Sequence, residues 1–225
     1  MNAGAKKPRM LVLCDFDGTI SIVDMGNELL NRFTDKGWEE IDRAYCAGEI
    51  GSRVAYTQVA SLFSGSKAQM LEFVISRERI DPHFLEFYRF CRSKGVDLKI
   101  VSDGLDFYID AILKKNNLQD IEFFSNVAVF HDGNKLSIEF PRINVECEKC
   151  GTCKKGVLRE HRSHYDLVIY IGNGHSDVCP AKDADLVFAK EVLYETCRQD
   201  GTACVHYENF RDILAYLDKA LCLNG

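Results

Sequence analysis

The sequence predicts a doubly wound α/β domain with a mostly parallel sheet, for two reasons. Apolar stretches of strand length recur along the chain, and amphipathic helices separate them. One such helix begins after Asp81 and ends at Gly95. Strands that alternate with helices favour a parallel sheet whose two faces are both covered. The predicted strands lie at 10–14, 96–101, 167–171 and 186–189.

The other segments are less regular. Residues 121–140 predict a hairpin, because two strand-like runs flank Asp132, Gly133 and Asn134. Residues 22–80 predict helices without a strong strand. Near the end of the chain, an apolar face predicts a closing helix; it consists of Phe210, Ile213, Leu214 and Leu217.

Composition limits the classes of protein that fit. The 225 residues suffice for one full core with a small appended domain, and 46% of them are hydrophobic. The net charge is −6 and no stretch gathers Lys and Arg, so we expect no nucleic-acid partner. No apolar run reaches the ~18 residues that cross a bilayer, and no export signal is visible. We therefore expect a cytoplasmic protein, a monomer or a homodimer, with most of its ten cysteines reduced.

Three predicted strands end in polar clusters. Asp15 and Asp17 follow the first strand, Ser102 and Asp103 the second, and the segment 172–177 follows the strand at 167–171. In doubly wound sheets the ligand crevice lies beyond the carboxyl ends of the strands. We therefore expect these clusters to meet in one site.

The chemistry of the first cluster is specific. Two carboxylates in an Asp-x-Asp pattern favour a hard cation such as Mg²⁺. A carboxylate is also a nucleophile for phosphorus, and a second one can protonate the leaving alcohol and activate water. The alternative is a strand-end turn in which Asp15 and Asp17 only cap the backbone.

The segment Asp15-Phe16-Asp17-Gly18-Thr19 resembles the first motif of the haloacid dehalogenase-like superfamily. The resemblance implies that Asp15 is the nucleophile, that Asp17 is the acid and base, and that both belong to a Mg²⁺ site. Ser102 is similar to the second motif, which holds a phosphate oxygen, and Lys154 to the third, which neutralises phosphoryl charge. The segment Gly172-Asn173-Gly174-His175-Ser176-Asp177 resembles the fourth motif, with Asn173 and Asp177 as metal-site residues.

Within this superfamily, Asp17 is typical of phosphatases and phosphomutases. The segment 22–80 resembles the helical cap of the phosphoserine phosphatase-like branch, which implies a Rossmann-like core of residues 1–21 and 81–225. Asp24 is either a substrate-facing acid of that branch or the N-cap of a helix. The resemblance also implies that substrate is bound by Gly18, Thr19, Asp24, Asp103 and Gly104.

A closer resemblance is to the 2-hydroxy-3-keto-5-methylthiopentenyl-1-phosphate phosphatases of bacterial methionine salvage. It depends on the segments 101–107, 147–154 and 177–190. It implies a Mg²⁺-dependent hydrolase of a small phosphate ester. Phosphatases of the phosphoserine or phosphocholine type share much of the pattern and stay open as alternatives, as does a phosphomutase.

The fourth motif departs from the family pattern, because Asn173 stands where Asp is usual. One negative charge is therefore missing, which should weaken metal binding. Three explanations stay open: a natural variant with lower affinity, an engineered change that traps a bound state, or a protein that binds a phosphorylated ligand without turnover. The intact Asp15, Asp17, Ser102 and Lys154 favour an enzyme.

Two further patterns carry alternatives. Lys154 and Lys155 are adjacent, and we assign the phosphate contact to Lys154. The spacing of Cys147, Cys150 and Cys153 suits a zinc site with Cys179 or His175 as fourth ligand; the favoured alternative is three thiols that are reduced or partly oxidised. Four aromatic residues are expected in the core of the cap, with the alternative that one or two of them line the apolar part of a methylthio substrate's site: Trp38, Tyr45, Tyr56 and Phe63.

Overall fold

The computed structural model describes residues 8–35 and 37–222 and contains one seven-stranded sheet. Its strand order is β4-β3-β2-β1-β5-β6-β7, with every pairing parallel except β3 with β4. β1 therefore lies at the centre, between the strands that carry the other polar clusters. The strands are β1 (Met10–Cys14), β2 (Val96–Leu105), β3 (Phe123–His131), β4 (Lys135–Glu139), β5 (Leu167–Gly172), β6 (Leu186–Ala189) and β7 (Val205–His206).

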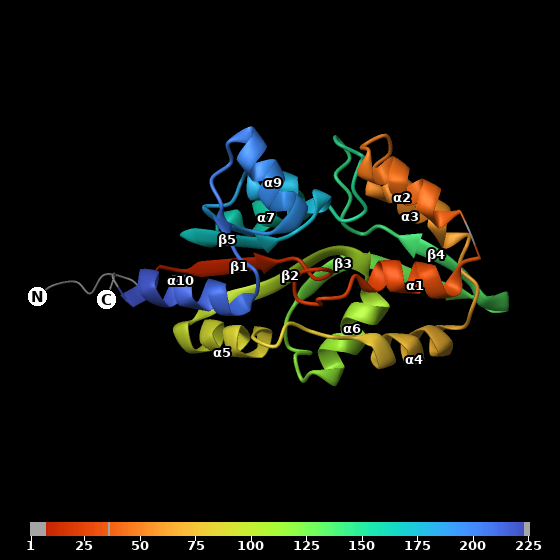
Figure 1. Cartoon of the computed structure of the whole chain (residues 1–225), viewed down its shortest axis with the longest axis horizontal. Coiled ribbons are helices and arrows are strands. Elements are labelled where there is room, and N and C mark those ends of the chain that lie inside the picture. Colours follow the sequence, from red (N-terminus) through yellow and green to blue (C-terminus); the bar gives the residue numbers. More distant parts are fainter. Residues whose placement is uncertain (1–7, 36, 223–225) are drawn as a thin grey trace, which may run out of the picture.

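Helices cover both faces of the sheet (Figure 1). Alternate residues of β1 face opposite sides, as the strand period requires. Val12 and Cys14 pack in the larger cluster together with residues of α5, α6 and α10, whereas Leu11 and Leu13 pack with α7. The helices outside the segment between β1 and β2 are α5 (Phe84–Lys94), α6 (Asp106–Lys115), α7 (Lys154–Arg162), α8 (Val178–Ala181), α9 (Glu191–Asp200) and α10 (Phe210–Cys222).

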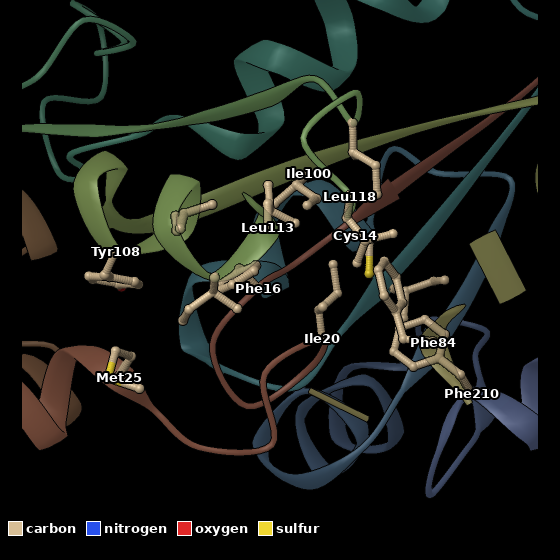
Figure 2. Packing of buried hydrophobic residues seen from close by; sticks show 14 of the residues in the cluster. Cys14, Phe16, Ile20, Met25, Phe84, Ile100, Tyr108, Leu113, Leu118 and Phe210 are labelled. Atoms are coloured by element: carbon tan, nitrogen blue, oxygen red, sulfur yellow. The ribbon is translucent and has the colours of Figure 1, made fainter. Parts of the chain in front are cut away.

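The larger cluster ties β1 to the segment that follows it. Phe16 and Ile20 come directly after the strand and are fully buried in the same cluster as Cys14 (Figure 2). Phe84 and Phe210 pack edge to face there, with ring centroids 4.9 Å apart. Because Phe16 lies between the two aspartates of the first motif, this packing fixes the backbone that carries both of them.

The segment between β1 and β2 forms four helices, α1 (Met25–Phe33), α2 (Trp38–Cys46), α3 (Ser52–Ala60) and α4 (Lys67–Arg77). α2 packs on α3, α3 lies beside β4, and α4 packs on α6 (Figure 1). We call these four helices and their connections, residues 22–80, the helical insert.

A loop of the core also holds the insert. The amide of Arg53 donates to the carbonyl of Lys149 at 3.1 Å, and the amide of Gly151 donates to Oγ of Ser52 at 3.1 Å. A Cβ atom at Gly51 would lie 2.1 Å from that Lys149 carbonyl oxygen, so only glycine allows this approach. We call residues 147–153 the cysteine loop.

The predicted fold class is confirmed, as are the hairpin and the helix that ends at Gly95, whose φ is 67°. The two-residue strand β7 was not predicted, because it is too short to carry a periodic pattern. In the part of the chain that the structure describes, no helix is long and apolar enough to cross a membrane.

Candidate active site

The three polar clusters meet at the carboxyl ends of β2, β1 and β5, which are neighbours in the sheet. β2 runs on to Leu105, beyond the end predicted at Val101. Its pairing with β3 passes from Val101 directly to Leu105, so that the three residues between them are unpaired. This irregularity turns Ser102, Asp103 and Gly104 toward the pocket described below.

Lys154 lies between two buried carboxylates. Its Nζ is 2.6 Å from Oδ1 of Asp15 and 2.7 Å from Oδ1 of Asp177, and its side chain is 2% exposed. Tyr170 on β5 also donates to Oδ1 of Asp177, at 2.6 Å. The amides of Asn173 and Gly174 donate to the other oxygen, Oδ2, at 3.0 and 2.9 Å. All four partners of Asp177 are therefore donors, and this carboxylate positions Lys154.

The electrostatics follow from burial. Burial and the neighbouring charge of Asp177 raise the pKa of Asp15 to about 7, although Lys154 opposes the shift. Burial lowers the pKa of Lys154, but Asp15 and Asp177 outweigh it and hold this pKa above the ordinary value. Lys154 is thus a permanent cation beside Asp15.

Asp17 contacts both the insert and the core. Its Oδ1 accepts from the amide of Met25, the first residue of α1, at 3.0 Å. Its Oδ2 accepts from the hydroxyl of Tyr108 on α6 at 2.5 Å. Burial and the charge of Asp24 raise the pKa of Asp17 well above its ordinary value, while Tyr108 lowers it. A carboxyl with a raised pKa can hold the proton that a departing alkoxide needs.

Ser102 and Asp103 both face the pocket, but they differ in how many of their polar atoms have hydrogen-bond partners. Oγ of Ser102 accepts from the amide of Gly104 at 2.9 Å, which leaves its hydrogen to donate to a ligand. Oδ1 of Asp103 accepts from Thr152 and Asn126, at 2.8 and 3.1 Å. Its Oδ2 is buried and has no hydrogen-bond partner in the described residues. Burial raises the pKa of Asp103 above its ordinary value.

Asn173 lies against the first motif. Its Oδ1 accepts from Oγ1 of Thr19 at 3.1 Å, and its Nδ2 donates to Oε2 of Glu191 at 2.9 Å. Gly18 has a φ of +73°, and a Cβ there would lie 2.3 Å from Nδ2 of Asn173. The glycine of the first motif therefore makes room for the side chain of the fourth.

A pocket of about 300 Å³ opens between these residues and the insert. The four aromatic residues expected in the core of the cap all line this pocket. Phe63 is also buried in the larger cluster, and Trp38 and Tyr56 pack against it, so these three belong to the core and to the pocket wall. α2 and α3 pack on each other and also present aromatic side chains to the cavity. Asp24 agrees with both interpretations given above: it caps α1 by accepting from the amide of Asn27 at 2.8 Å, and it also lines the pocket. The aromatic lining residues are Trp38, Tyr45, Tyr56 and Phe63.

The remaining alternatives separate in the structure. Lys155 points away and pairs with Asp183 at 3.2 Å. Cys153 caps α7, with its Sγ accepting from the amide of Gly156 at 3.3 Å. Within residues 8–35 and 37–222 no three His, Cys, Asp or Glu side chains are arranged to hold a metal ion, so the cysteine loop gives no support to a zinc site.

Three residues of the site escaped the sequence reasoning: Tyr108, Tyr170 and Glu191. Both tyrosines lie in apolar segments, where the pattern predicts packing, and their hydroxyl partners depend on tertiary contacts. Glu191 lies at the start of a helix, where an acid is ordinary. No local signal distinguishes any of the three.

This sheet defines a phosphatase of the haloacid dehalogenase-like class, with Asp15, Asp17 and Ser102 at the carboxyl ends of its central strands and Lys154 at the start of α7 beside them. Solved structures of that class agree with the fold. The chain is similar to a phospho-aspartyl intermediate analogue of phosphoserine phosphatase, with a TM-score of 0.74 and 21% identity over 93% of this chain and 99% of that one. A substrate-bound phosphoserine phosphatase complex gives a TM-score of 0.71 at 20% identity, over 94% and 99% of the two chains.

Sequence relatives are more specific. The model of the family described as Putative Phosphatase matches residues 10–193, and the chain belongs to this family. A 2-hydroxy-3-keto-5-methylthiopentenyl-1-phosphate phosphatase of Exiguobacterium sibiricum is 31% identical over 92% of this chain and 95% of its own length. The phosphatase of the same name from Brevibacillus brevis is 28% identical over 94% of this chain and 96% of its own.

Proposed function

We propose that the protein hydrolyses a small-molecule phosphate monoester through a phosphoryl group carried on Asp15. One observation carries the proposal: the ammonium group of Lys154 is buried between Asp15 and Asp177, at the carboxyl end of the central strand. A buried cation beside a nucleophilic carboxylate suits a reaction in which phosphoryl charge develops. Asp15 lines the pocket, so that it can reach a substrate.

The reaction proceeds in two steps. A carboxylate oxygen of Asp15 forms a bond to phosphorus while the ester P–O bond breaks, and the leaving oxygen takes the proton of Asp17. Water then gives a proton back to Asp17 and attacks phosphorus, which releases inorganic phosphate and restores the carboxylate of Asp15. Ser102 and Lys154 donate to the non-bridging oxygens in both steps.

We further propose that Mg²⁺ occupies the site, and the donor set fits it. The acidic groups of buried Asp15 and Asp177 and of half-buried Asp17 face one cation, Lys154, so a divalent ion suits their excess of negative charge. Asp15, the backbone carbonyl of Asp17, Oδ1 of Asn173 and waters would hold it, which agrees with the small number of side-chain ligands that Mg²⁺ takes. When bound, Mg²⁺ lowers the cost of the phosphoryl charge. Asp177 then acts through Lys154 and the Asn173 backbone.

The pocket wall favours a substrate whose far end is not anionic. Its described residues contain no Lys or Arg, and its insert side carries four aromatic rings together with Leu29 and Val59. A carboxylate such as that of phosphoserine would find no cation there. We propose a methylthio-bearing sugar-derived phosphate, the substrate class named for the relatives, because a thioether packs well on aromatic rings.

A choline-type phosphate is the second candidate. The same wall contains the carboxylates of Asp24 and Asp42 near Trp38 and Tyr56. Aromatic faces with nearby carboxylates also suit a quaternary ammonium group. The proposal includes residues 22–80 as a cap that closes over the substrate, and a cytoplasmic enzyme that is a monomer or a homodimer.

The experiment is phosphate release with saturating Mg²⁺ from three substrates: a methylthio-bearing sugar phosphate, phosphocholine and phosphoserine. We expect turnover of the first, little of phosphoserine, and none of any substrate with Asp15→Asn. The folded state of the variant is checked by its thermal midpoint. Turnover that survives Asp15→Asn would refute the mechanism, and a preference for phosphoserine would refute the reading of the pocket.

The binding-protein alternative is tested with Asn173→Asp. If the enzyme works with reduced metal affinity, this variant should raise the rate at limiting Mg²⁺. Tight binding of a phosphate ester by both proteins, with no release of phosphate at any Mg²⁺ concentration, would favour a binding role. Transfer to an added alcohol in place of water would favour a phosphomutase.

A further inference from the structure

Asparagine creates a problem of orientation at position 173 that aspartate would not. Both oxygens of a carboxylate can face a cation, but an amide has one oxygen and one NH₂ group, which repels cations. A rotation of 180° about the last bond of Asn173 would therefore turn a ligand into an obstacle. A Mg²⁺ site that uses this side chain needs a second group that fixes the amide.

Thr19 does not fix it. Its hydroxyl donates to Oδ1 of Asn173 at 3.1 Å, but a hydroxyl can accept as easily as donate. It would accept equally well from the NH₂ group of a rotated amide. The choice between the two orientations must come from the other neighbour of the amide.

Glu191 is that neighbour. Its Oε2 lies 2.9 Å from Nδ2 of Asn173, and an ionised carboxylate only accepts hydrogen bonds. It therefore admits the NH₂ group and rejects the amide oxygen, which leaves Oδ1 directed at the hydroxyl of Thr19. Because Glu191 is exposed to solvent, its charge carries little desolvation cost.

The backbone at Glu191 has an unusual conformation that neighbouring main-chain hydrogen bonds hold in place. Its φ is +50°, a left-handed value that is uncommon for a residue other than glycine. The amide of Leu193 donates to the carbonyl of Asn173 at 2.9 Å, and that of Lys190 to the carbonyl of Gly172 at 3.3 Å. These bonds join the start of α9 to the fourth motif on both sides of the strained residue. Such strain persists where the surrounding structure imposes it, often at functional sites.

We propose that Glu191 is a positioning residue for the metal site: it holds the Asn173 amide with Oδ1 toward the cation. Glu191 also supplies a negative charge near the metal site, although it acts through its hydrogen bond to Asn173 rather than as a ligand. The inference rests on the proposed function, since it assumes that Mg²⁺ binds here. It assigns a role to a residue outside the four sequence motifs.

The test measures Mg²⁺ affinity by titration calorimetry without substrate, in the full chain and in two backgrounds. With Asn173 present, Glu191→Gln should weaken Mg²⁺ binding about tenfold, because glutamine can accept or donate and no longer selects one orientation. With Asn173→Asp, the same change should weaken binding less than threefold, since aspartate needs no orientation. Equal losses in both backgrounds would mean a simple loss of charge and would overturn the proposal.

Two further variants complete the design. Glu195→Gln removes an exposed charge one turn along α9 and should leave Mg²⁺ affinity unchanged. Glu191→Gly relieves the left-handed strain while removing the carboxylate, so its thermal midpoint in chelator should equal or exceed that of the wild type while Mg²⁺ affinity falls. Unchanged affinity in Glu191→Gly would overturn the inference.

Failure of the inference and failure of the proposed function give different results. If the wild type releases phosphate and binds Mg²⁺ but Glu191→Gln binds it equally well, only the role of Glu191 is refuted. If the wild type binds no Mg²⁺ and Asp15→Asn changes no rate, both are refuted.

Discussion

The hydroxyl of Tyr108 donates to Oδ2 of Asp17 at 2.5 Å, which links helix α6 to the acid of the proposed reaction. Tyr108 is fully buried, and no sequence motif pointed to it. Together with the amide of Met25, it occupies both oxygens of Asp17 and fixes the carboxyl group in place.

Tyr108→Phe should lower kcat about tenfold, the rate equivalent of losing one hydrogen bond of ~1.4 kcal/mol. Without the hydroxyl, the pKa of Asp17 rises further, because Tyr108 lowers it in the wild type. The alkaline limb of the pH–rate profile, along which Asp17 loses its proton, should therefore move to higher pH. Tyr216→Phe, a change at an exposed position, serves as the control. An unchanged profile would show that Tyr108 only packs.

Gly104→Ala should lower activity by about a hundredfold in a folded protein. A Cβ at this position would lie 1.9 Å from the Tyr108 hydroxyl and 2.7 Å from Oδ2 of Asp17, so the pair must separate. The measurement is kcat, normalised to folded protein by circular dichroism. Gly95→Ala is the matched control: its φ of +67° is strained for alanine, but nothing lies near the added atom, so stability should fall and kcat should not. Normal turnover in Gly104→Ala would contradict the assigned role of Asp17.

Asp177→Asn should destabilise the protein by about 2–3 kcal/mol, because all four groups around this carboxylate are donors. Whichever way the amide turns, its NH₂ group meets donors and hydrogen bonds are lost. If the NH₂ group faces Lys154, the ammonium group of Lys154 loses its hydrogen-bond acceptor and its ion pair, and activity also falls. Urea denaturation in chelator measures the free energy of unfolding. The control is Asp183→Asn, which removes a partly exposed partner of Lys155 and should cost less than about 1 kcal/mol. Equal costs would contradict the positioning role.

Asp103→Asn should change how stability depends on pH. Burial raises the pKa of Asp103, so the folded protein keeps a proton that the unfolded chain loses near its ordinary value of 3.8. Stability from this group is therefore present below pH 4 and is lost as pH rises toward the raised pKa. The variant has no such group, so its stability relative to the wild type should increase as the pH rises through this range. Thermal midpoints from pH 4 to 8 in chelator measure the difference, and a constant difference would contradict the shift.

The order of strands and helices could be predicted because each depends on local pattern. The apolar run at 10–14 and the turn after it need no distant partner to be recognised. The convergence of Asp15, Ser102 and the fourth motif could also be predicted, because parallel strands bring their carboxyl ends together.

The other residues of the site could not be predicted, because their roles depend on tertiary contacts. Tyr108 and Tyr170 look like core residues until their hydroxyl partners are placed, and the aromatic residues of α2 and α3 look like a closed core until the cavity is seen. An apolar helix face has the same pattern whether another helix or a substrate covers it. Glu191 needed a backbone conformation that no sequence period reports.

The hydrogen bonds between the cysteine loop and the start of α3 use main-chain atoms and the hydroxyl of Ser52, beside one exposed ion pair of Arg53 with Glu148 at 3.9 Å. Gly51 offers no side chain at all. This attachment of the insert to the core therefore uses none of the aromatic side chains that line the cavity. Exchange of an aromatic residue on α2 or α3 should therefore leave these contacts with the cysteine loop in place. Directed evolution toward new phosphate esters should accordingly accept changes at Trp38 or Tyr56 more readily than at Gly51, where almost none should be tolerated.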